Sequence, residues 1–173
     1  MATINGKALV RDGKPLDRVY SNGQLVYSRN LIVRTGELDG KMIGLSGEIA
    51  SLGGSSTVTP AIIKVTIGEP LTMSGTAAGD NYFRYAFYDM AGKTLMRSVT
   101  DLRSATTVIA PAKATTFRIS YQKEAQVKLE RGNVPTDWTP APEDVQSDIS
   151  KRAIDTSVVH NTGNETVAGN KNI

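Results

Sequence analysis

The strongest constraint in this sequence is a period-two alternation of apolar residues that recurs in several short segments. Such a segment has one apolar and one polar face, which is the pattern of a half-buried β-strand. Turn-forming residues separate the segments at short intervals, so we expect antiparallel strands. The apolar faces are Ile63, Val65 and Ile67; Leu71 and Met73; Phe83, Tyr85 and Phe87; Phe117, Ile119 and Tyr121; Ala125, Val127 and Leu129. The pattern predicts an all-β fold, an antiparallel jelly-roll-like β-sandwich over residues 30–141.

One stretch within this range does not alternate. Residues 36–58 are rich in Gly, and we expect loops there with one irregular strand or helical turn.

Residues 1–29 carry an imperfect internal echo, in which NGKALVRDGK is answered by NGQLVYSRN. The dipeptides Asn5-Gly6, Asp12-Gly13 and Asn22-Gly23 suit two-residue type I′ turns, so two short hairpins are expected. An isolated hairpin is marginally stable in water, and this N-terminal leader should therefore pack against something else. We interpret it as a docking or assembly element; a leader strand of the following domain is the alternative.

Residues 142–173 form a polar tail. Val145, Ile149 and Ile154 lie near helical spacing, Pro142 suits a first helical turn, and acidic residues follow it. These features predict a short helix of about ten residues that begins at Pro142. No apolar pattern of the size of a core follows, and we expect the chain to be a fragment of a larger protein.

The composition excludes several classes of site. The chain has no Cys, so disulfides, thiol catalysis and thiolate metal sites are excluded. The net charge is +3, but the basic residues are dispersed among acidic ones, so no nucleic-acid surface is expected. No stretch has the ~20 apolar residues of a membrane span, and the start does not have the pattern of a signal peptide.

Catalysis is not expected either. The only His, His160, lies in the polar tail, where no partners for a Ser-His-Asp triad are evident. The carboxylates of the sandwich fall mostly in turns or beside basic residues, unlike a glycosidase pair. No cofactor is expected, although a structural Ca²⁺ bound by oxygen ligands such as Glu37, Asp39 or Asp80 is left open.

The polar faces of two predicted strands offer a candidate ligand surface. If Phe83, Tyr85 and Phe87 face the core, their neighbours face outward, and the same holds for the strand around Ile119. A mixture of aromatic, Arg and amide side chains suits saccharides, because sugar rings stack on aromatic faces and hydroxyls hydrogen-bond to Arg and Gln. The candidate saccharide-binding residues are Tyr82, Arg84, Tyr88, Arg118 and Gln122. The alternative is that the two tyrosines pack under loops and that Arg84 pairs with an acidic residue.

The phrase KLERGNVPTDWTPAPEDV resembles the end of carbohydrate-binding-module-like domains in tail and baseplate proteins of phages that infect Gram-positive lactic-acid bacteria. The similarity covers residues 29–145 and includes RNL, IGEPLTMSG, FRYAFYDMAGKTL and APAKATTFRISY. The start of the chain resembles the leader of such baseplate or tail-fibre proteins. The closing DTSVVHNTGNETVAGNKNI resembles the start of a fibre shaft.

The resemblance implies a non-enzymatic host-recognition module of a phage tail tip or baseplate that binds cell-wall polysaccharide of a Gram-positive host. The alternative is a structural spacer of a tail fibre with no ligand of its own. The expected location is the virion, and the expected partners are the host polysaccharide and other tail or baseplate proteins, with no nucleic acid and no membrane. Since fibres of this resemblance are usually trimeric, the full-length protein is expected to be a homotrimer or to be fixed to a symmetric tail assembly through its leader. The isolated sandwich is expected to be a monomer.

Trp138, the only Trp, sits within the closing phrase. We interpret it as a structural lid that folds back over the sandwich edge and covers an open core, rather than as a platform for sugar. The X-Pro steps that follow it force extended backbone and stop the sheet.

Overall fold

The structure, a computed structural model, describes residues 10–12, 14–51, 56–58, 62–76, 82–101 and 104–153. Strands dominate, and one helix follows them within these residues. The strands are β1 (Val10–Arg11), β2 (Lys14–Pro15), β3 (Arg18–Ser21), β4 (Gln24–Ser28), β5 (Leu38–Asp39), β6 (Lys41–Ile43), β7 (Ile49–Ser51), β8 (Ser56–Val58), β9 (Ile63–Lys64), β10 (Pro70–Thr76), β11 (Tyr82–Tyr88), β12 (Thr94–Asp101), β13 (Thr106–Ile109), β14 (Thr116–Gln122) and β15 (Gln126–Arg131). The helix is α1 (Pro142–Ala153). The predicted all-β class, with N-terminal hairpins and a short C-terminal helix, is confirmed.

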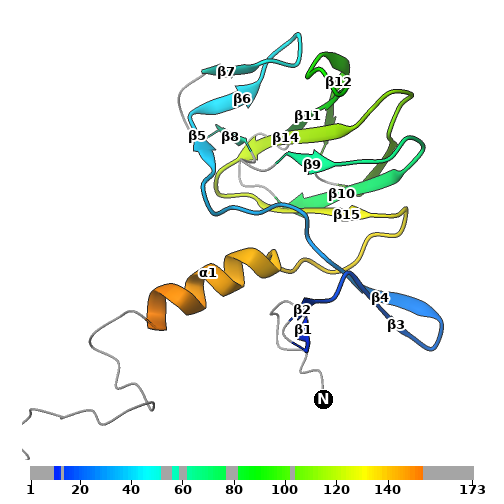
Figure 1. Cartoon of the computed structure of the whole chain (residues 1–173), viewed down its shortest axis with the longest axis vertical. Helices are drawn as coiled ribbons and strands as arrows, with labels where there is room; N and C mark the ends of the chain where they lie inside the picture. Colours follow the sequence, from blue (N-terminus) through cyan, green and yellow to red (C-terminus); the bar gives the residue numbers. More distant parts are fainter. Residues whose placement is uncertain are drawn as a thin grey trace, which may run out of the picture.

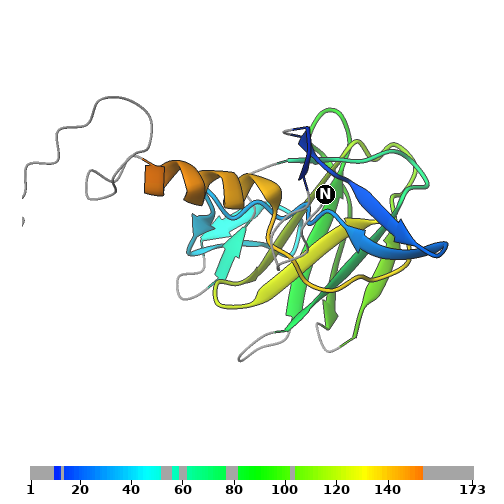
Figure 2. The ribbon, with the colours of Figure 1, turned by 90° about the horizontal axis from the view of Figure 1, so that it is seen from below.

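Two antiparallel sheets form the sandwich (Figure 1). The smaller sheet has the strand order β13-β10-β15. The larger one has the order β12-β11-β14-β8-β5, and β9 also pairs with β14. The view from below shows the long strands of both sheets beside one another (Figure 2).

The core lies between the sheets and has the register that the alternation predicts. Phe83, Tyr85 and Phe87 of β11 are buried, as are Phe117, Ile119 and Tyr121 of β14. Phe87 and Phe117 are directly opposite each other across the two strands, with ring centroids 4.9 Å apart. Aromatic pairs at this separation stabilise beyond the area that they bury.

The structure corrects two expectations about the first half of the sandwich. Ile67 was expected on the buried face with Ile63, yet it is 60% exposed, because β9 ends at Lys64 and the chain turns at Ile67 and Gly68 before β10. The glycine-rich stretch was expected to be mostly loop, but it contains β5, β6 and β7, and β6 pairs with β7 in a hairpin.

The β6–β7 hairpin covers part of the outer face of the larger sheet. The Ile43 amide donates to Ser120 Oγ at 3.1 Å, and Arg97 Nε donates to the Gly44 carbonyl at 3.1 Å. Ala86, which projects to the same outer face between Phe87 and Tyr85, is fully buried. The hairpin therefore crosses the sheet from β14 to β12 as a third layer.

The leader forms the two hairpins that its turn dipeptides predict. β3 pairs with β4 around Asn22 and Gly23, whose φ values of 49° and 79° fit a type I′ turn. β1 pairs with β2 around Asp12, which has a φ of 50°. Asn5 and Gly6 lie outside the described residues. Tyr27 and Ser28 at the end of β4 are buried, so the leader packs against its own sandwich.

The outer face of β15 is buried as well, although its residues are charged. Lys128 and Glu130 are both 0% exposed, with 3.8 Å between Lys128 Nζ and Glu130 Oε2. Thr136 donates its amide and its hydroxyl to the Glu130 carboxylate, and Lys128 Nζ donates to the Asp137 carbonyl at 2.6 Å. Tyr27 of the leader covers the ammonium group, which lies 5.8 Å from its ring centroid. Burial lowers the pKa of Lys128, while Glu130 opposes that shift.

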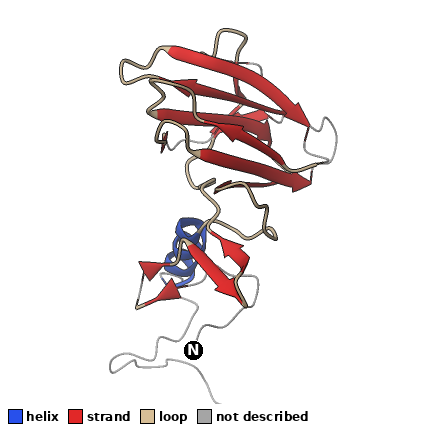
Figure 3. Cartoon of the chain, turned by 90° about the vertical axis from the view of Figure 1, so that its right-hand side faces the viewer, coloured by secondary structure: helices blue, strands red, loops and turns tan. Residues whose placement is uncertain are grey.

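α1 begins at Pro142, as predicted, with Glu143 and Asp144 in its first turn. Val145 is half-buried and Ile149 is exposed, and Ile154 lies outside the described residues. The leader hairpins and α1 lie together at one end of the molecule, and the sandwich rises from that end (Figure 3). Within the described residues, no helix is long and apolar enough to cross a membrane.

The buried Lys128–Glu130 pair gives a stability prediction. Replacing Lys128 with Met should lower the free energy of unfolding by about 3 kcal/mol, because the Glu130 carboxylate stays buried without its cation. The double variant Lys128→Met, Glu130→Gln should recover part of that loss, since the neutral amide still accepts from Thr136. Urea unfolding of the three proteins measures both values. Equal stability of the single and double variants would contradict the prediction.

Candidate functional site

Two of the pockets in the described part of the protein differ in the hydrogen-bonding capacity that they leave to a ligand. The first, which we call the hairpin pocket, lies between the β6–β7 hairpin and the outer face of the larger sheet and has a volume of about 310 Å³. It is lined by Gly47, Glu48, Ile49, Ile62, Tyr88, Gly92, Thr116 and Arg118.

One wall of the hairpin pocket is the contact between Tyr88 and the hairpin turn. The Tyr88 hydroxyl donates to the Gly47 carbonyl at 2.6 Å. Gly47 has a φ of 89°, and a Cβ there would lie 2.4 Å from Thr94 Oγ1, so only Gly fits this close approach. The hydroxyl donates its only proton to this hydrogen bond, but its oxygen can still accept a hydrogen bond from a ligand.

Charge of both signs meets in this pocket. Burial raises the pKa of Tyr88, the positive charge of Arg118 opposes the shift, and the negative charge of Glu48 adds to it. The Glu48 carboxylate accepts from the Ser46 amide at 3.0 Å through one oxygen. The pocket therefore combines an acceptor, a cation and the apolar side chains of Ile49 and Ile62.

The structure brings together two of the five predicted saccharide-binding residues. Tyr88 and Arg118 both line the hairpin pocket. Arg84 and Gln122 belong to the same outer faces of β11 and β14 but do not line it. Tyr82 begins β11, and its side chain lies outside the described part of the structure.

Sequence reasoning missed Glu48, Ile49 and Ile62. The hairpin that positions Glu48 and Ile49 was hidden by its glycines, although the apolar pairs Met42–Ile43 and Ile49–Ala50 around the GLSG turn were the signal for it. Ile62 was assigned to no face, and it is 54% exposed at the pocket.

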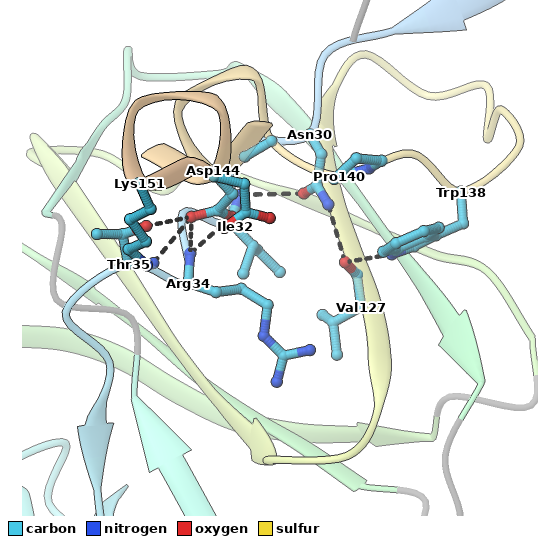
Figure 4. Close-up of a pocket in the computed structure, with 11 residues that line it drawn as sticks. Asn30, Ile32, Arg34, Thr35, Val127, Trp138, Pro140, Asp144 and Lys151 are labelled. Atoms are coloured by element: carbon cyan, nitrogen blue, oxygen red, sulfur yellow. Dashed lines mark hydrogen bonds between the residues drawn. The ribbon is translucent and has the colours of Figure 1, made fainter. Parts of the chain in front are cut away.

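The second pocket, the helix pocket, lies between α1, the segment after the leader and the edge of β15 (Figure 4). Its volume is about 360 Å³. Figure 4 shows Asn30, Asp144 and Trp138 around it, with the hydrogen bonds that join them to neighbouring segments.

Asn30 has no hydrogen-bonding capacity left for a ligand. Its Nδ2 donates to the Val127 carbonyl at 2.9 Å and to the Thr139 carbonyl at 3.0 Å. Its Oδ1 accepts from the Ile32 amide at 3.0 Å and from the Leu129 amide at 3.2 Å. These four bonds exhaust the two donors and two acceptor positions of a side-chain amide.

Two charged groups of the helix pocket, Arg34 and Asp144, are also engaged within the protein. Asp144 accepts from the amides of Arg34 and Thr35 and from the Thr35 hydroxyl. Arg34 donates to Glu37 and to the carbonyls of residues 123 and 125. The Tyr121 hydroxyl donates to Glu37 at 2.5 Å, and burial together with this bond raises the pKa of Tyr121. The helix pocket is therefore a structural joint that fixes α1 on the sandwich.

Trp138 lies at the rim of this joint. Its Nε1 donates to the Val127 carbonyl at 3.1 Å, and the side chain is 40% exposed. The prediction that it folds back over the sandwich agrees with this bond. It does not close the core, however, since the buried core cluster does not include it.

The residues considered as calcium ligands are used in other ways. Glu37 binds Arg34 and Tyr121, and Asp39 pairs with Lys123. Asp80 lies outside the described residues. No group of three or more His, Cys, Asp or Glu that could hold a metal ion occurs in the described ranges.

Comparison with protein-family models, curated proteins and solved structures gave no match. The likeness of residues 29–145 to phage tail domains therefore rests on the sequence phrases alone.

The joint at Asn30 gives a second stability prediction. Replacing Asn30 with Ala should lower the free energy of unfolding by about 3 kcal/mol, because the buried Leu129 amide and Val127 carbonyl each lose a partner. The matched control is Asn133→Ala at an exposed position, which should change it by less than about 0.5 kcal/mol. Denaturant unfolding compares the two variants. If they unfold alike, Asn30 does not hold the joint.

Proposed function

We propose that this chain is a non-enzymatic recognition module of a phage tail or baseplate, and that its hairpin pocket binds cell-wall saccharide of a Gram-positive host. The observation that carries the proposal is the division of the molecule into two ends. The leader and α1 gather at one end, while the β6–β7 hairpin lies across the sandwich from them (Figure 1). A module held at one end can thus present its pocket at the other.

The chemistry of the hairpin pocket supports a saccharide ligand. Hydroxyl-rich rings require both donors and acceptors, together with apolar surface against their C–H faces. Arg118 donates, Glu48 and the Tyr88 oxygen accept, and Ile62 supplies apolar surface. The volume of about 310 Å³ is at the lower end of small-molecule pockets, which suits a short saccharide.

Two turns that contribute glycines to the pocket also carry exposed apolar side chains. The turns that contribute Gly47 and Gly92 also carry Leu45 and Met90, which are 87% and 92% exposed. Large apolar side chains this exposed are available for contact with another molecule.

The leader supports attachment to an assembly. One side of it packs on its own sandwich, but Tyr20 and Val26 are 59% and 46% exposed. The narrow apolar stripe of α1 provides Ile149 as a second exposed contact. We propose that these surfaces meet other tail or baseplate proteins or further copies of the chain, as in a homotrimer located in the virion.

A structural spacer is the second candidate, and one observation favours it. The β6–β7 hairpin covers the middle of the outer face, where Ser120 and Ala86 are buried, so no broad platform for a polysaccharide remains. A spacer would show no binding to cell walls.

The test is sedimentation of the full chain with purified Gram-positive cell walls. Ile62→Glu should weaken binding by about tenfold or more, because it replaces the apolar surface offered to the sugar ring with a negatively charged side chain. Ile67→Glu is the matched control, since Ile67 is similarly exposed and lies outside the pocket. It should bind like the parent protein. No sedimentation with walls from any host would refute the proposal and favour the spacer.

A further inference from the structure

Arg118 is a half-buried cation that has no partner among the described residues. It lies on the outer face of β14 and lines the hairpin pocket. Within the described part of the chain, its guanidinium makes no hydrogen bond and no ion pair. The arginines that join segments elsewhere behave differently, since each donates to a carbonyl or carboxylate: Arg18, Arg29, Arg34, Arg97 and Arg131.

The free energy of a half-buried guanidinium depends on what replaces its water. A guanidinium that has lost part of its hydration is unfavourable until an acceptor binds it. Its planar fork of N–H donors fits the oxygens of a phosphate or carboxylate in a bidentate manner. A neutral sugar hydroxyl offers only one oxygen at a time and uses this fork poorly.

The acidic group of the pocket does not take this role. Glu48 is close enough to influence Tyr88, yet it forms no ion pair with Arg118 and instead accepts from the Ser46 amide. A ligand that carried an anionic group beside hydroxyls could bind Arg118 through the former and Glu48 through the latter.

We propose that the hairpin pocket binds an anionic saccharide, with a phosphate or carboxylate on Arg118 and hydroxyls on Glu48 and the Tyr88 oxygen. This inference rests on the proposed function and adds the chemical class of its ligand. At about 310 Å³ the pocket takes one charged sugar residue, and the remaining saccharide extends beyond it.

The chain offers a matched control for Arg118. Arg84 is half-buried on the outer face of the neighbouring strand, and its guanidinium likewise makes no hydrogen bond or ion pair with the described residues. It does not line the pocket. Arg118→Ala and Arg84→Ala therefore make the same charge change on the same sheet face, inside and outside the proposed site.

The first experiment uses three soluble probes of similar size: glucose, glucuronate and glucose 1-phosphate. In titrations of the full chain followed by NMR at low salt, we expect at least one charged probe to bind about tenfold more tightly than glucose. Arg118→Ala should abolish this difference, and Arg84→Ala should preserve it. Equal affinity for the three probes, or equal effects of the two substitutions, would overturn the anionic ligand.

The second experiment separates this inference from the proposed function. Cell walls are tested intact, after removal of phosphate with hydrofluoric acid, and after conversion of carboxylates to amides. Loss of binding after one treatment supports the inference and identifies the anion. Unchanged binding after both treatments overturns the inference and leaves the recognition function in place. If no walls are bound but glucose 1-phosphate or glucuronate still requires Arg118, the anion site stands and the recognition function falls.

Discussion

One side-chain amide, that of Asn30, connects three segments that are far apart in the sequence. It bonds to β15 through residues 127 and 129, to the closing segment through Thr139, and to its own segment through Ile32. An amide that makes four bonds in a buried position has little freedom to move. The exit of the leader and the start of α1 are consequently held beside the same strand. This explains why both ends of the described chain gather at one end of the sandwich.

The same arrangement explains the charged interior next to β15. The residues that cover its outer face, from Gly132 to Trp138, are irregular backbone, which cannot satisfy its own amides and carbonyls as a sheet does. Lys128 supplies donors for Thr136 and the Asp137 carbonyl, and Glu130 supplies acceptors for Thr136. An apolar pair would leave these groups unsatisfied. The buried ion pair is therefore a consequence of covering a sheet with a loop.

The strands could be predicted from the sequence where burial follows the period-two alternation. The segments that cover the outer faces of the sheets, which are the loop over β15 and the β6–β7 hairpin, could not be predicted. Phe83, Ile119 and their neighbours alternate because the core lies on one side of their strands. Lys128 and Glu130 follow the same alternation and read as a solvent face, since nothing local indicates that a loop 6–9 residues later covers them. The β6–β7 hairpin was not predicted for a related reason. Its strands have three residues each and lie among glycines, so they contain too few alternations to be recognised.

The candidate site was partly predictable for the same physical reason. Strand register placed Tyr88 and Arg118 on the outer face, but the hairpin decides which part of that face is pocket and which part is covered.

The two pockets differ in how many of their hydrogen-bond donors and acceptors are already bonded within the folded chain. In the helix pocket, Asn30, Arg34 and Asp144 form hydrogen bonds within the chain itself, so these polar side chains stabilise the joint. In the hairpin pocket, Arg118 is desolvated in part and is left without an acceptor by the described residues. Such a group does not stabilise the fold, because a partly desolvated cation without an acceptor costs free energy that a neutral side chain would not cost. The hydrogen bonds that folding leaves unmade at Arg118 remain available to a ligand.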